Sequence, residues 1–356
     1  MLNALWILIF FSLFALTQMA LFLRVGLNGV RIARSFTKER LFEGESLQMI
    51  ELIENRRFLP LPWLRLESRM PASFLFSQSE NLEIEGLRYH HSVFFLGPWR
   101  RVRRAHELKA ARRGHYQLVS VSITVGDLLG IKSVTVSLPM QASVTVYPRL
   151  LPRERLSLPA SRWQGEALVR RFIQPDPFLY NGIRAYQPGD APRDIHWRAY
   201  ARTGELKVKQ RDYSAASKLL LLLNIAPAEL LWGEIGSEAH ERLEEAIRTA
   251  ASLCVYALGD GLDVGLGSNA DLTQFDGQTL FLPPSSGPQQ RERLLEALAR
   301  LRLRRAANFH AYLQSLPPLA GCDILVLSAY SSPLIERELE RLRGNGNTAD
   351  FYPFPG

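Results

Sequence analysis

The chain has 356 residues, of which 47% are hydrophobic and 22% charged, and its formal net charge at pH 7 is +8. This length leaves room for two domains with accessory segments, and the hydrophobic content argues against wholesale disorder. Cys254 and Cys322 are the only cysteines and stand in apolar surroundings without metal-ligand spacing. We therefore expect buried packing thiols rather than a disulfide framework or a zinc site, which favours a reducing compartment.

The charge is divided unevenly along the chain. From Arg24 to Asp212 there are 31 basic and 18 acidic residues, a difference of +13, whereas residues 213–356 hold 12 basic and 17 acidic residues, a difference of −5. A basic front half suits anionic lipid headgroups, an acidic partner or nucleic acid, and it is equally compatible with an arginine-rich soluble surface. No nucleic-acid motif occurs and the cations are scattered, so nucleic acid is not an expected partner.

The first 23 residues carry no charged side chain. A helix of that length covers ~34 Å, enough for a hydrocarbon layer of ~30 Å. A cleaved signal peptide would carry a positive start and a small-residue cleavage site, and a buried soluble helix is rarely apolar on every face at a terminus. The sequence therefore predicts a transmembrane anchor at residues 1–23.

A basic juxtamembrane segment at residues 24–40 follows the predicted anchor. No side-chain cation precedes the anchor, so the positive-inside rule places the remaining domains on the cytoplasmic side of an inner (plasma) membrane, with the lipid bilayer as a partner. The cations that carry this expectation are Arg24, Arg31, Arg34, Lys38 and Arg40.

Residues 41–148 consist of short β-type segments between turn residues. "SLQMIELIEN", "HYQLVSVSITV", "SVTVSL" and "ASVTVYP" are rich in alternation and β-branched side chains, and glycines and prolines separate them. This pattern predicts a β-sandwich-like domain of about 100 residues.

Beyond a connector at residues 149–212, the pattern alternates between strands and helices. "KLLLLL" is a continuous apolar run typical of a buried parallel strand, and "LDVGLG", "QTLFL", "DILVLSA" and "ADFYPF" are further strand candidates. Helices are expected at Ser237–Leu258, at Pro288–Leu303 and in a segment that ends at Gly344. The alternation predicts a doubly wound α/β domain at residues 213–356.

The connector contains a highly charged segment from Tyr186 to Asp212. Its Pro188–Gly189 pair predicts a turn, Asp190 stands where a helix N-cap would, and Gly204 stands where a helix would end, so we expect a helix at Ala191–Thr203. The sequence then changes to a spacing of two, which predicts a strand. On that strand Lys207, Lys209 and Arg211 face one side, and Leu206 and Val208 face the other.

Two explanations of this segment remain open. On the expected helix Asp194, Arg198 and Arg202 share one face, while Arg193 can stack on Trp197. Read as structure, Asp190 caps the helix, Asp194 pairs with Arg198, and Trp197 packs one domain on another. Read as chemistry, the segment is an anion or acidic-partner site, or a hydrolase-type centre that uses His196 with Asp190 or Asp194. No nucleophile or oxyanion loop is marked nearby, which disfavours catalysis.

The pattern "Y-x-P-G-D-x-x-R-x-I-H-W-x-A-x-A-R-x-G-x-L-x-V-K" resembles the signature of the bacterial family catalogued as domain of unknown function 58. The matching positions are Tyr186, Pro188, Gly189, Asp190, Arg193, Ile195, His196, Trp197, Ala201, Arg202, Leu206, Val208 and Lys209. "FEGE", "ENRRFLPLPWLRLE" and "RRGHYQLVSVSITVGDLLGI" are also typical of the family's β-rich part, so the resemblance covers nearly the whole chain. Family members often have two hydrophobic segments, whereas this chain has one.

The resemblance implies a C-terminal domain similar to a von Willebrand factor A domain at residues 213–356. It also implies genomic company with MoxR-type AAA+ ATPases and membrane-anchored transglutaminase-like proteins, and no established enzymatic activity. We therefore expect a membrane-anchored, non-enzymatic interaction or assembly protein that partners a MoxR-type AAA+ ATPase, with a hydrolase as the alternative.

One departure from a metal-binding A domain concerns the residues after the first buried strand. Such a domain has Asp-x-Ser-x-Ser there, whose carboxylate and hydroxyls bind a hard cation. This chain instead has Asn224, Ala226 and Ala228, and its later strand ends in Ser328–Ala329 without an acidic residue. The sequence thus predicts a degenerate metal site and no cofactor.

Overall fold

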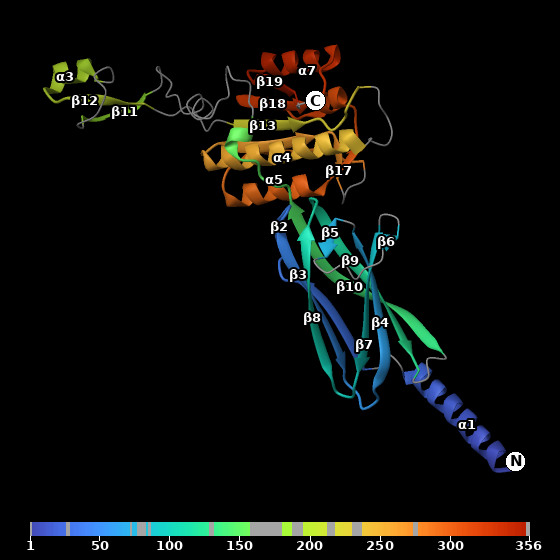
Figure 1. Ribbon diagram of the computed structural model, residues 1–356. Coiled ribbons are helices and arrows are strands. Elements are labelled where there is room, and N and C mark those ends of the chain that lie inside the picture. Colours follow the sequence, from blue (N-terminus) through green and yellow to red (C-terminus); the bar gives the residue numbers. More distant parts are fainter. Residues whose placement is uncertain are drawn as a thin grey trace. The chain divides into compact units, whose positions relative to one another are not determined.

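A computed structural model describes residues 2–25, 29–71, 73–76, 83–84, 87–127, 132–156, 180–186, 195–211, 218–229, 237–272 and 277–353. The chain divides into two compact units, Met1–Arg149 and Leu150–Gly356. In Figure 1 the first unit consists of strands apart from helix α1, whereas the second unit contains both strands and helices.

The first unit begins with the apolar helix α1 (Leu2–Val25). In the part of the chain that the structure describes, no helix combines the length and the apolar character needed to cross a bilayer. This finding overturns the predicted transmembrane anchor at residues 1–23. Within α1, the Gln18 side chain is 6% exposed and donates a hydrogen bond to the Asp127 carboxylate at 3.2 Å.

The predicted juxtamembrane segment at residues 24–40 also needs correction, because 7 of its residues form a strand. β1 (Val30–Phe36) pairs antiparallel with β3 (Ser46–Asn55). Arg34, which the sequence analysis counted as a flanking cation, is 5% exposed within β1 and binds Glu51 of β3.

Two sheets form the body of the first unit. The four-stranded sheet has the order β1-β3-β8-β5, where β8 is Arg101–Ala110 and β5 is Phe74–Phe76. The six-stranded sheet has the order β2-β10-β9-β4-β7-β6. Its members are β2 (Arg40–Phe42), β10 (Ser133–Tyr147), β9 (Gly114–Gly126), β4 (Leu61–Pro71), β7 (Leu87–Leu96) and β6 (Glu83–Ile84).

The two sheets bury alternate residues against each other. β3 shows this alternation most clearly, since Leu47, Met49, Glu51 and Ile53 are 3% exposed or less while the residues between them are more exposed. Met49 and Leu108 of the smaller sheet pack in one cluster with Val144 and Val146 of the larger one. Burial of these aliphatic side chains, at about 25 cal/mol per Å², is what holds the sheets together.

One charged cluster interrupts this apolar interior. The Arg34 guanidinium donates two hydrogen bonds to Glu51 Oε1, one of them from Nε at 2.7 Å, and another to the Ser68 hydroxyl on β4 of the opposite sheet. Glu51 is fully buried, and its second oxygen lies 3.7 Å from His106 Nε2 on β8. The cluster therefore ties the two sheets together through a charge that has no access to water.

The second unit is built on a five-stranded sheet of order β16-β14-β13-β18-β19. β13 (Lys218–Leu223), β14 (Asp263–Ser268), β18 (Cys322–Ser328) and β19 (Thr348–Pro353) are parallel, and β16 (Leu280–Ser285) is antiparallel. Helices cover both faces: α4 (Ser237–Gly259) and α5 (Pro288–Arg300) lie on one, and α6 (Phe309–Ser315) and α7 (Pro333–Gly344) on the other.

Central strand β13 explains this arrangement. Leu219 to Leu223 are all 2% exposed or less, because alternate leucines face the two helical layers. On α4, the predicted apolar stripe includes Leu243, Ile247 and Cys254, which are likewise buried. Both cysteines are free and buried, and burial raises the pKa of the Cys254 thiol far above its usual range.

Several short elements were not expected from the sequence. The helix predicted at Pro288–Leu303 ends at Arg300, and "LRLRR" forms strand β17 (Leu301–Arg305) instead, paired with β15 (Ala270–Leu272). An alternating Leu-x-Leu pattern fits a strand as well as a helix end, so local pattern alone does not decide it. A 3₁₀ turn, η1 (Arg153–Arg155), opens the unit.

Candidate functional site

The family signature folds into a small module of a hairpin and one helix. β11 (Tyr180–Ala185) pairs antiparallel with β12 (Lys207–Arg211), and α3 (Trp197–Thr203) lies between them in the chain. Two further hydrogen bonds close the module: the Tyr186 amide donates to the Leu206 carbonyl at 3.0 Å, and the His196 amide to the Lys207 carbonyl at 2.7 Å. The described signature residues thus connect α3 to β12 through backbone hydrogen bonds.

His196 has a structural task at the start of α3. Its Nδ1 accepts a hydrogen bond from the Ala199 amide at 2.9 Å, which is the position of an N-cap side chain. The helix was predicted to begin at Ala191 with Asp190 as the cap, but the described helix begins at Trp197 and His196 caps it. Pro188, Gly189, Asp190, Arg193 and Asp194 lie outside the described residues, and so do the turn, the cap and the pairings predicted for them.

The other end of α3 agrees with the sequence. Gly204 has φ of 70°, a left-handed conformation that glycine adopts without steric cost, and its amide donates to the Tyr200 carbonyl at 2.9 Å. The predicted strand after it is confirmed as β12. Val208 is 4% exposed, as expected, whereas Leu206 lies before the strand and is 42% exposed instead of facing inward. Lys209 and Arg211 belong to β12, and only their backbone is described.

The module presents aromatic and cationic side chains to solvent. Trp197 is 62% exposed and meets Tyr200 edge to face, with ring centroids 6.3 Å apart. The structural explanation of the segment has Trp197 pack one domain on another, and that role stays a prediction. We call the exposed set the signature surface; it consists of Tyr186, Trp197, Arg198, Tyr200, Arg202, Leu206 and the half-buried Lys207.

A second candidate site lies where the parallel strands end. Asn224 follows β13 and is fully buried; its Nδ2 donates to Ser328 Oγ, at the end of β18, at 2.9 Å. Its Oδ1 accepts from the Ala226 amide and from Asn269 Nδ2, both at 3.0 Å. Carboxyl ends of parallel strands are where α/β sheets bind ligands, so this is the place where an A domain would hold its cation.

The donors present here do not fit a hard cation. The Asn269 side-chain oxygen accepts from the Ile225 amide at 3.0 Å, and its nitrogen also reaches the Ala307 carbonyl at 3.2 Å. Ser328 Oγ donates to the Tyr330 carbonyl at 2.7 Å. These neutral amides and the hydroxyl therefore bond to one another and to the backbone, and the described residues bring together no group of three or more His, Cys, Asp or Glu side chains at metal-binding range.

Sequence reasoning singled out Asn224 and Ser328 but missed Asn269. The available signal was its position directly after the apolar strand Asp263–Ser268, since polar residues at strand ends gather at one edge of a parallel sheet. Tyr330 was also missed. Burial raises the pKa of its phenol, a hydrogen bond with Asn224 lowers it, and the nearby Glu229 carboxylate raises it further.

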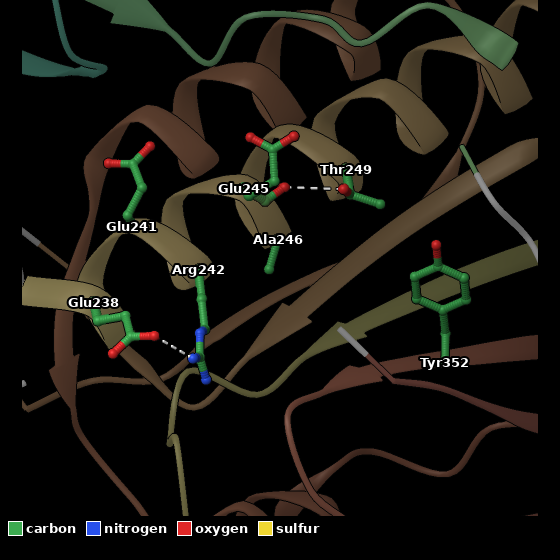
Figure 2. Close-up of a pocket in the computed structure, with 7 residues that line it drawn as sticks. All are labelled: Glu238, Glu241, Arg242, Glu245, Ala246, Thr249 and Tyr352. Atoms are coloured by element: carbon green, nitrogen blue, oxygen red, sulfur yellow. Dashed lines mark hydrogen bonds and ion pairs between the residues drawn. The ribbon is translucent and has the colours of Figure 1, made fainter. Parts of the chain in front are cut away.

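A pocket of about 340 Å³ opens beside α4 (Figure 2). Its lining is acidic, but arginines neutralise much of it: Arg242 binds Glu238 at 2.6 Å, and Arg248 binds both Glu241 at 3.1 Å and Glu245 at 2.9 Å. The rest of the lining is Ala246, Thr249 and Tyr352. With its carboxylates already paired, the pocket offers little free charge for a cationic ligand.

Part of the chain matches a known protein family. Residues 182–326 match the model of the family described as "Protein of unknown function DUF58". The match begins in β11 and reaches into β18, so it includes the module and most of the five-stranded sheet. It supports the resemblance that the signature residues indicate.

A particular relative supports the same class. The chain is 26% identical over 247 residues to "Uncharacterized protein YeaD" of Bacillus subtilis (strain 168), in an alignment that covers 68% of this chain and 56% of the relative. The chain thus spans little more than half the length of the curated relative that it matches.

Solved structures resemble only part of the chain. A non-cellulosomal cohesin from Archaeoglobus fulgidus is 13% identical, with a TM-score of 0.23, and the match covers 33% of this chain and 91% of the cohesin. The CARDB domain of the PF1109 protein from Pyrococcus furiosus is 14% identical, with a TM-score of 0.21, over 33% of this chain and 93% of that domain. At such TM-scores the likenesses carry no argument.

Proposed function

We propose that this protein is a non-enzymatic interaction or assembly protein whose signature surface binds a protein partner. The observation that carries the proposal is the exposed Trp197–Tyr200 pair beside the cations Arg198 and Arg202. Trp, Tyr and Arg dominate the binding energy of protein interfaces, because they combine large apolar area with directional hydrogen bonding. A module that exposes all three kinds on one short helix is suited to docking.

The geometry of His196 favours this proposal over the hydrolase alternative. A general base of the Ser-His-Asp type donates Nδ1–H to a carboxylate and accepts the substrate proton at Nε2. In His196, Nδ1 is the acceptor for the Ala199 amide, so the neutral ring carries its proton on Nε2. To act as a base it would have to give up the cap of α3.

The identity of the partner rests on the family resemblance. A MoxR-type AAA+ ATPase is the partner we propose, with a membrane-anchored transglutaminase-like protein as a second member of the assembly. The cationic signature surface supports an acidic docking site on such a partner, since charge complementarity speeds and orients association.

The five-stranded sheet is part of the proposal as a metal-independent relative of an A domain. Asn224 stands where the cation-binding aspartate would be, and its amide is bonded to Ser328, Ala226 and Asn269. These hydrogen bonds hold the carboxyl-terminal edge of the sheet in place without a metal ion. They support the proposal that this edge recognises a partner without a bridging ion.

The test is affinity capture of the full chain with the candidate ATPase. Trp197→Ala combined with Arg198→Glu is expected to weaken binding by at least about tenfold, since each interface anchor of this kind contributes ~2 kcal/mol. The matched control is Trp99→Asn, which removes an exposed tryptophan of the other unit and is expected to leave binding unchanged. Equal capture by both variants and by the unmodified chain would refute the signature surface as the docking site.

A further inference from the structure

Another exposed aromatic group lies at one end of the first unit, where β3 turns into β4 and β7 into β8. Phe58 in the first turn is 81% exposed, and Trp99 in the second is 68% exposed. Phe95, near the end of β7, is 72% exposed. Leu61 and Leu96 beside them are fully buried, so the chain buries its aliphatic residues here and leaves the aromatic ones exposed. Exposed apolar patches of this kind often mark interaction sites.

The two turns are joined into one rigid element by Asn55, which is 1% exposed. Its side-chain Nδ2 donates to the carbonyls of Leu59 and Gly97, both at 2.9 Å. Its backbone amide donates to the Arg100 carbonyl, also at 2.9 Å. The Trp99 amide donates to the Arg57 carbonyl at 3.1 Å. Phe58 and Trp99 are therefore presented on a shared scaffold rather than on two independent loops.

The backbone of Trp99 is strained. Its φ is 51°, and among the described residues it is the one non-glycine with a positive φ. A bulky residue rarely adopts this conformation, and here it does so without burying its ring. Strain that persists at an exposed side chain is a recurring feature of binding sites, because the surrounding hydrogen bonds maintain it.

Arginines surround the aromatic side chains. Arg56 and Arg101 both pair with Glu54, at 2.9 and 3.1 Å, and Arg57 and Arg100 lie in the same two turns. Residues 54–60 and 97–101 thus hold four arginines and one acidic residue, so the sequence of the two turns has an excess of positive charge. We call Phe58, Trp99 and these four arginines the aromatic tip.

Helix α1 ends near the aromatic tip. The Arg56 amide donates to the Gly29 carbonyl at 2.9 Å, and four peptide links separate Gly29 from Val25, the last residue of α1. Four links span at most ~14 Å, so the end of α1 lies within that distance of the tip. Exposed apolar side chains of α1 include Trp6, Phe10, Phe11 and Phe14.

We propose that the aromatic tip is a peripheral binding site for an anionic lipid surface. Exposed Phe58 and Trp99 fit the headgroup region, where apolar rings leave water and the indole N–H can still form a hydrogen bond. Arginine binds the phosphates of the lipids in two-pronged hydrogen bonds. The proposal concerns the loops of a β-unit and requires no helix across the bilayer. It is independent of the signature surface.

The test is flotation of the full chain with vesicles of phosphatidylglycerol and phosphatidylcholine, compared with phosphatidylcholine alone. Phe58→Ser with Trp99→Asn removes the rings, and Asn tolerates the left-handed backbone. We expect the partition coefficient on anionic vesicles to fall about tenfold, because affinity scales with buried apolar area and charge. Adding Arg100→Glu to the double variant is expected to lower the partition coefficient further, on anionic vesicles only. This added effect should disappear as salt shortens the screening length from ~10 to ~3 Å.

The matched control is Val119→Ser, a substitution at a residue of β9 that is 69% exposed. It is expected to bind like the unmodified chain. Circular dichroism establishes that each variant is folded. If the double variant floats as well as the control, α1 or another surface accounts for the binding and the proposal is wrong. It is equally overturned if the unmodified chain ignores vesicles and the double variant instead changes from dimer to monomer in sedimentation, since the tip would then bind a second copy.

Discussion

The two units solve the problem of buried polarity in opposite ways. The first unit buries a charge, with Arg34 between Glu51 and Ser68, and so depends on the partner remaining in place. The second buries neutral amides, with Asn224 and Asn269 bonded to each other, to backbone amides and carbonyls and to Ser328. A buried charge that loses its partner is very costly, whereas an amide network loses only the bonds of the group removed.

The largest expected effect comes from separating the charged pair. Arg34→Met takes the arginine partner away from the buried Glu51 carboxylate, and we expect a loss of about 3–5 kcal/mol in the free energy of unfolding. Chemical denaturation of the full chain, monitored on the first unit, measures it. The double variant Arg34→Met/Glu51→Leu is expected to regain most of the loss, and a double variant no more stable than the single one would contradict the comparison.

Removing one amide from the second unit should cost less. Asn269→Ala leaves the Ile225 amide and one side of Asn224 without their bonds, and we expect a loss of about 2–3 kcal/mol, borne by the second unit alone. Asn308→Ala, at the start of α6 where no side-chain cap is formed, serves as the control and should change little. A loss as large as that of Arg34→Met would mean that the two clusters do not differ in kind.

A smaller effect is expected from a carboxylate near the surface of the second unit. Burial raises the pKa of Glu338, but hydrogen bonds from Gln314 and Arg341 outweigh it and leave that pKa lowered. A lowered folded-state pKa means that the stabilisation is present above the unfolded-state value of ~4.3 and is lost as pH falls through the folded-state value. Glu338→Gln is therefore expected to lower the thermal midpoint by about 1–2 °C at neutral pH and by less in acid. A larger difference in acid than at neutral pH would contradict this sign.

Elements with one dominant local pattern were the predictable part of the fold. The strand Lys218–Leu223 follows from an unbroken leucine run, the α4 stripe from helical spacing, and the ends of α3 and α7 from Gly204 and Gly344. The strand Leu301–Arg305 was not predictable in this way, because its alternation continues a helix and its paired residues in Ala270–Leu272 lie 29 to 35 positions earlier in the sequence. The predicted transmembrane anchor was wrong, since the described part of the chain contains no helix that is long and apolar enough to cross a bilayer.

In the candidate sites, too, the features with a local sequence pattern were predicted, and those that depend on distant residues were not. The strand at Lys207 was visible in the spacing, whereas the capping role of His196 depends on where the helix starts, and the sequence favoured Asp190 for that place. The bond between Asn224 and Asn269 joins residues of neighbouring parallel strands, and their adjacency follows from strand order rather than from any local signal. The aromatic tip was not predicted because its two turns lie far apart in the sequence and are joined by hydrogen bonds of Asn55 and of the Trp99 amide.

The buried arginine also selects how the first strand aligns on its neighbour. Opposite Arg34 in the β1–β3 pairing stands Glu51 itself. A slip of one residue would turn Arg34 toward water and leave the carboxylate facing apolar neighbours, because side chains alternate between the faces of a sheet. β1 lies at the edge of its sheet, and there this charge pair adds to the packing of Val30 and Ile32 in distinguishing the correct pairing from a shifted one.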